Sequence, residues 1–73
     1  MLKNENNSKS IFEKLQNVGF HQENEESFYL GRIVVEVDGG NIEIMEIVEG
    51  NYYTLYVGQP DNVTEGFLRE IVK

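Results

Sequence analysis

Residues 33–44 read IVVEVDGGNIEI and place two alternating apolar segments on either side of a turn. Ile33, Val35 and Val37 recur at every second position, which is the pattern of a strand with one covered face. The turn at 38–41 contains two glycines and an asparagine, residues that tolerate the positive φ angles of a tight hairpin. The stretch therefore predicts an antiparallel β-hairpin, and the rest of the chain is interpreted around it.

The first strand of this hairpin is expected to extend back to Phe28. Phe28 and Leu30 share one parity and Ile33 begins the other, so we expect a bulge or bend at Gly31-Arg32 that returns both sets to one face. Residues 21–27 contain three glutamates and no apolar side chain. They are expected to form a solvated acidic loop.

Two further strands are predicted after the turn. Residues 42–48 carry glutamates at a spacing of three that continues to Glu49, which would suit one side of a helix. Four β-branched residues and a glycine on each side of the segment favour a strand instead. After a turn at 49–51, residues 52–57 alternate as a third strand, which ends before Pro60.

Amphipathic helices are expected on both sides of the strands. Ser10 and Glu13 form the Ser-x-x-Glu capping box, followed by a 3.6-residue apolar stripe, so the sequence predicts a helix at 10–18. Asp61 or Asn62 is expected to cap a second helix at the end of the chain.

These elements predict an α+β fold. The expected architecture is a two-layer sandwich with an N-terminal helix, a three-stranded antiparallel meander and a C-terminal helix (αβββα), both helices covering one sheet face. Residues 1–8 are polar and without periodicity, so they are expected to be a disordered or frayed N-terminus. Residues 9–73 are expected to form a single small domain.

Composition excludes several classes of protein. Thirteen acids against six bases give a formal charge of -7 in 73 residues, which disfavours direct binding to nucleic acid or to an anionic membrane. The chain has no cysteine, no apolar segment long enough to span a membrane and no signal-peptide pattern at its start. We expect a cytoplasmic protein, in the host cytoplasm if it is encoded by a phage.

No constellation of catalytic residues is evident. His21 is the single histidine and has no orienting partner or nucleophile in a recognisable motif, so a surface role is expected. Asp38 with Glu43, Glu46 and Glu49 could in principle hold a hard cation, but the spacing is not that of a calcium loop. We therefore expect no enzymatic activity, no metal and no cofactor.

The placement of charge is the most informative feature. Residues 21–61 hold nine acids and one base, a net charge of -8. The sheet face left open by the helices is predicted to carry the following side chains: Arg32, Val34, Glu36, Glu43, Tyr52, Thr54 and Tyr56. This is an acidic surface with aromatic residues in its middle. The alternative is that this surface is an ordinary half-polar sheet face whose charge serves solubility alone.

The functional hypothesis is a binding protein that occludes a basic, nucleic-acid-binding site on a partner protein. Tyrosine is a favoured interface residue, and acidic surroundings steer a basic partner. The partner-binding residues predicted on this basis are Glu36, Glu43, Glu46, Glu49, Tyr52 and Tyr56. The alternative is a homo-oligomeric structural or assembly protein, such as a homodimer, that uses its exposed sheet face or edge.

In size, acidity, absence of cysteine and lack of catalytic residues, the chain is similar to small inhibitors that phages and mobile elements direct against host nucleic-acid enzymes. Anti-CRISPR proteins and uracil-DNA glycosylase inhibitors are examples. The resemblance is one of composition and assigns no role to any residue. It implies a counter-defence function.

Overall fold

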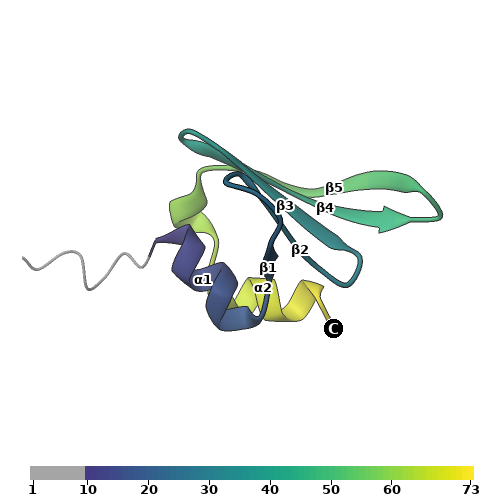
Figure 1. Ribbon diagram of the computed structural model, residues 1–73, viewed down its shortest axis with the longest axis horizontal. Coiled ribbons are helices and arrows are strands. Elements are labelled where there is room, and N and C mark those ends of the chain that lie inside the picture. The colour runs from purple at the N-terminus through teal and green to yellow at the C-terminus, as the bar shows by residue number, and fades with distance from the viewer. Residues whose placement is uncertain (1–9) are drawn as a thin grey trace, which may run out of the picture.

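The computed structural model describes residues 10–73, which form two helices on one face of a five-stranded antiparallel sheet (Figure 1). The strand order is β1-β2-β3-β4-β5. The elements are α1 (Ile11–Val18), β1 (His21–Gln22), β2 (Ser27–Leu30), β3 (Ile33–Asp38), β4 (Asn41–Val48), β5 (Asn51–Gly58), the 3₁₀-helix η2 (Pro60–Asn62) and α2 (Glu65–Ile71). The α+β prediction is confirmed, whereas the predicted number of three strands is wrong. The predicted frayed segment 1–8 lies outside the described residues.

The strand count differs because Gly31-Arg32 is a turn and not a bulge. Leu30 pairs with Ile33, so two residues reverse the chain and make β2 and β3 separate antiparallel strands. Gly31 adopts a φ of 60°, a left-handed conformation that suits glycine. A bulge and a two-residue turn both leave Leu30 and Ile33 on the same face, so the parity of the sequence does not distinguish them. The remaining strand, β1, lies in the segment expected to be an acidic loop and pairs with β2.

The start of α1 is as predicted. The Ser10 hydroxyl accepts a hydrogen bond from the Glu13 backbone N–H at 3.1 Å, and the Glu13 carboxylate accepts one from the Ser10 N–H at 3.3 Å. Gly19 ends the helix with a φ of 115°. The capping box therefore gives hydrogen-bond acceptors to two backbone N–H groups at the start of the helix, those of Ser10 and Glu13.

Removing this cap is expected to destabilise the fold. Ser10→Ala should lower the free energy of unfolding by about 1 kcal/mol, because the Glu13 N–H loses its acceptor. Urea denaturation followed by circular dichroism measures the change. Ser27→Ala is the matched control, since Ser27 lies in a strand and makes no side-chain hydrogen bond with residues 10–73. An equal loss in both variants would contradict a capping role.

The second helix begins later than predicted. Asp61 and Asn62 belong to η2, and Thr64 is the N-cap of α2, with its hydroxyl accepting from the Phe67 N–H at 3.0 Å. Pro60, at the first position of η2, favours the short 3₁₀ turn that precedes the helix. This turn brings Val63 into the core, where it is 1% exposed.

The core lies between the helices and the sheet. Side chains of both helices meet alternate residues of β2, β3 and β4, and no polar or charged residue among residues 10–73 is buried with them. The buried residues are Ile11, Leu15, Phe20, Phe28, Ile33, Val35, Val37, Ile42, Ile44, Val63 and Leu68. The opposite face of the sheet has no covering layer within the described part of the chain, so its side chains are available for binding.

Candidate protein-binding face

The sheet face turned away from the helices, called the open face below, is defined by the cross-strand pairs. Buried residues pair with buried residues across the ladder, for example Val35 with Ile44, so the residues between them share the other side. By this alternation the open face carries His21, Ser27, Tyr29, Val34, Glu36, Asp38, Asn41, Glu43, Met45, Ile47, Tyr52, Thr54 and Val57. All five strands contribute to it.

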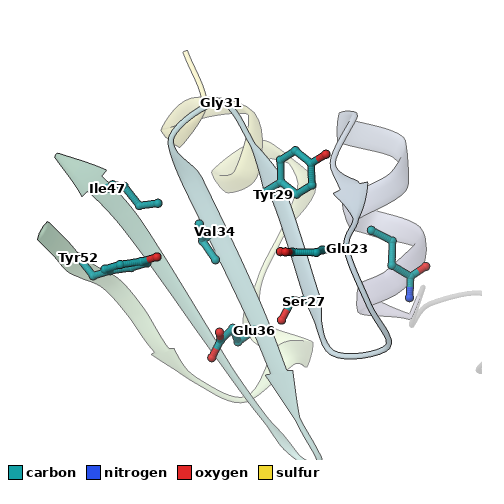
Figure 2. A pocket seen from close by; sticks show the side chains of 9 residues that line it. Glu23, Ser27, Tyr29, Gly31, Val34, Glu36, Ile47 and Tyr52 are labelled. Carbon is teal, nitrogen blue, oxygen red and sulfur yellow. The ribbon is translucent and has the colours of Figure 1, made fainter. Parts of the chain in front are cut away.

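A hollow of about 700 Å³ occupies the middle of the open face. Figure 2 shows Val34 near its centre, with Tyr29 on one side and Tyr52 on the other. Two carboxylates, of Glu23 and Glu36, also line it. The hollow therefore combines an apolar floor, two aromatic side chains and negative charge.

The acidic part of the open face lies beside this hollow. Glu36 and Glu43 stand directly opposite each other on β3 and β4, an arrangement of like charges that destabilises a sheet. Together with Asp38 they line a second, smaller hollow of about 180 Å³ at the β3–β4 end of the face. The Thr54 hydroxyl donates to the Glu43 carboxylate at 3.0 Å, which satisfies one oxygen without adding positive charge.

The cations of the described residues are all engaged away from these acids. Arg32 pairs with Glu46, Arg69 with Glu65, and Lys73 with Glu70. Lys14 donates to the Val63 carbonyl at 2.8 Å. Within residues 10–73, the three open-face acids Glu36, Asp38 and Glu43 therefore have no ion-pair partner. Their charge is available to a basic ligand.

The structure brings together three of the six predicted binding residues. Glu36, Glu43 and Tyr52 lie on the open face as predicted. Glu46 lies on the other side of β4, opposite Ile33 and Tyr53, and binds Arg32. Arg32 itself is a turn residue and does not belong to the regular open face. Glu49 occupies the tip of the β4–β5 hairpin with a φ of 53°. Glu46 and Glu49 thus carry charge at other surfaces of the molecule.

Tyr56 is the clearest correction, because it was expected on the open face and faces the helices instead. Ile44 pairs with Tyr56 but the next residue, Met45, pairs with Thr54, so Leu55 is an extra residue in β5. This irregularity reverses the alternation of β5 relative to β4. The Tyr56 ring packs edge-on against α2 at 6.3 Å from the Phe67 ring, and its hydroxyl donates to the Gln59 carbonyl at 2.9 Å.

Most residues of the open face were not among the predicted binding residues, and three of them bear on binding. Tyr29 lies between two core residues of β2, so strand alternation alone could have placed it. His21 lies beside it, with ring centroids 5.3 Å apart, because the short strand β1 pairs with β2. Ile47 contributes an apolar wall to the hollow. Its outward direction follows from continuing the alternation of Ile42 and Ile44 along β4.

The comparisons add no family assignment, since no protein-family model, curated protein or solved structure matches the chain. None of the helices within residues 10–73 has the length and apolar character required to cross a membrane. Among the same residues, no group of three or more histidine, aspartate and glutamate side chains is arranged to hold a metal ion.

Neutralising one of the two opposed glutamates is expected to stabilise the fold. Glu36→Gln should raise the free energy of unfolding by about 0.2–1 kcal/mol, because it removes the repulsion from Glu43 across the strand pair. Urea denaturation at low salt measures the change, and in high salt the difference should shrink as the charges are screened. Asp61→Asn, an exposed substitution in η2, serves as the control. A destabilised Glu36→Gln protein would show that the carboxylate supports the sheet rather than straining it.

Proposed function

We propose that this protein is a small, non-enzymatic binding protein whose open face occludes a basic surface on a partner protein. The observation that supports the proposal is the group of three carboxylates, Glu36, Asp38 and Glu43, that lacks a cation within the described residues and adjoins an aromatic-flanked hollow. Repulsion between Glu36 and Glu43 lowers the stability of the sheet. A cationic partner would offset that cost on binding.

The hollow suits the side chain of an arginine or lysine from the partner. Tyr29 and Tyr52 are 43% and 62% exposed, so part of each ring is available for a cation–π contact. Glu36 lines the same hollow and can accept hydrogen bonds from a guanidinium or ammonium group. Val34 and Ile47 supply apolar contact for the aliphatic stem of such a side chain. The hollow and the carboxylates would thus recognise different parts of one basic residue or of two neighbouring ones.

Basic protein surfaces bind nucleic acid through its phosphates, and a ligand that covers such a surface with carboxylates competes with phosphate. We extend the proposal to a partner that is a nucleic-acid enzyme, inhibited in the cytoplasm by occlusion of its binding site. Compositional similarity to phage and mobile-element inhibitors supports a counter-defence role, such as that of an anti-CRISPR protein.

Comparison of two affinity columns tests the proposal. One carries the wild-type chain and the other the Glu36→Gln/Glu43→Gln variant, and both are loaded with the same bacterial lysate and eluted with rising salt. We expect a basic, nucleic-acid-binding protein on the wild-type column alone, released at moderate salt because exposed charge contacts are screened.

A third column carrying Asp61→Asn/Glu70→Gln controls for net charge, since both of these acids are exposed and lie outside the open face. It should retain the same protein as the wild type. If the captured proteins are the same on all three columns, or if none of them is basic, the open face is not the binding site that we propose.

A further inference from the structure

β5 is a long strand at the edge of the sheet. Its eight residues, Asn51–Gly58, pair with β4 on one side only. No backbone hydrogen bond from the described part of the chain reaches its other side, so alternate N–H and C=O groups there remain available for another strand. The opposite edge of the sheet, β1, contains only two residues.

The side chains of β5 leave this edge unprotected. Proteins commonly guard an exposed edge with charged side chains, proline or a short strand. Residues 51–58 contain no charged side chain and no proline, and the irregularity at Leu55 is the one protective device present. Tyr52, Tyr53, Leu55 and Val57 are 62%, 53%, 40% and 63% exposed. Figure 1 shows that the β4–β5 hairpin extends past the helices, so the helix layer does not cover its tip.

We infer that β5 is a homodimer interface that pairs antiparallel with β5 of a second copy of the chain. A formal charge of -7 opposes contact between two copies at most surfaces, and β5 is a continuous eight-residue segment where no charge opposes it. When a strand pairs antiparallel with the same strand of a second copy, the two copies are related by a two-fold axis and each contributes the same surface. The uncharged edge therefore favours a second copy over a basic partner, which would gain nothing from it electrostatically.

Pairing through β5 is expected to stop at two copies. Each copy contributes five strands, and the edges remaining after β5 is paired are the two-residue β1 strands, which offer little for further pairing. The association therefore stops at a dimer and does not propagate into a fibre.

A two-fold axis that pairs antiparallel strands runs perpendicular to the sheet, so it leaves both open faces on the same side. The hollows of the two copies would then open in one direction, and both helix layers would lie behind. The dimer does not depend on the proposed function. If both hold, one partner surface would meet two acidic faces and bind with the gain that comes from two linked sites.

The exposed area predicts a reversible dimer. A tyrosine ring that is more than half exposed offers on the order of 100 Å². With Leu55, Val57 and the backbone of the edge, each copy buries a few hundred Å², less than the roughly 800 Å² per partner of a standard stable interface. A reversible monomer–dimer equilibrium is therefore expected, and not a permanent dimer.

Sedimentation equilibrium of the full chain over a range of concentrations tests the inference. The informative variant is Tyr53→Lys/Val57→Lys, because positions 53 and 57 lie opposite Glu46 and Glu43 on β4. Each introduced lysine has a glutamate beside it in the monomer, so the fold is retained. In a dimer the two copies would bring four lysines to the paired edge, two on each face of the sheet. We expect a monomer–dimer equilibrium in the wild type, and at least about a tenfold weaker one in this variant.

The control Gln16→Lys/Gly66→Lys makes the same change in net charge on the two helices, at exposed positions. It should dimerise as the wild type does. Amide hydrogen exchange provides a second readout: alternate amides of residues 51–58 should become protected as the wild-type concentration rises. A wild type that stays monomeric at high concentration would overturn the inference. Unchanged dimerisation of the Tyr53→Lys/Val57→Lys variant, or protection that does not follow concentration, would do the same.

Discussion

Phe28→Ala is expected to lower the free energy of unfolding by about 3–5 kcal/mol. Phe28 is the largest of the fully buried side chains at 1% exposed, and its ring lies 5.6 Å from that of Phe12 on α1. It pairs with Val35 in the centre of the sheet, so its removal leaves a cavity between α1 and two strands. A domain of this size has only about 4–10 kcal/mol of stability in total, so the variant should be largely unfolded or close to it.

Urea denaturation followed by circular dichroism measures this loss. Phe28→Leu keeps most of the apolar volume and should lose less, which gives a measurable value if the alanine variant does not fold. Tyr52→Ala is the matched aromatic control, because Tyr52 is 62% exposed and its truncation should cost less than about 1 kcal/mol. Similar losses for Phe28→Ala and Tyr52→Ala would mean that the core does not lie between the helices and β2.

Reversal of the two opposed glutamates is the change expected to have the largest effect on binding. Glu36→Lys/Glu43→Lys should weaken the affinity for the captured basic partner by about 100-fold or more, because it places like charges in contact at the centre of the interface. The two substituted positions still face each other with equal charge, so the sheet gains and loses no cross-strand repulsion. The main loss of stability is the exposed Thr54–Glu43 hydrogen bond, about 1 kcal/mol, so the fold should be retained.

Isothermal titration calorimetry at low and high salt measures the effect. Asp61→Lys/Glu70→Lys changes the net charge by the same amount at exposed positions of η2 and α2, and should weaken binding far less. The wild-type affinity should fall as salt rises, since the contacts are screened. Equal affinities of the two reversal variants, or an affinity of the wild type that is insensitive to salt, would refute an electrostatic role for the open face.

Local signals in the sequence predicted much of the fold correctly. The capping box at Ser10, the two-glycine turn between β3 and β4, and the turn at Gly50 all act over a few residues, and each lies where it was expected. Strand alternation did not predict the number of strands correctly. A bulge and a hairpin turn at Gly31-Arg32 leave the same pattern of apolar residues, and β1 has no apolar residue to reveal it.

The candidate site was predicted only in part, because its residues were assigned to a face by strand alternation. Glu36 and Glu43 were placed on the open face because β3 and β4 alternate without interruption. Tyr56 was misplaced because the extra residue Leu55 changes the phase of β5, and nothing in the alternation of Tyr52 to Val57 marks it. Tyr29 and Ile47 joined the site only when the five strands were assembled around the hollow.

The α+β class, the first helix, the central hairpin and the acidity of the sheet region could all be predicted from the sequence, because capping, turn chemistry and charge are properties of a few neighbouring residues. The tertiary structure was needed to show that Tyr56 faces the helices, that Glu46 forms an ion pair with Arg32, and that the outer edge of β5 has no neighbouring strand among residues 10–73. These features depend on strand order and register, which are set by contacts between residues distant in the chain.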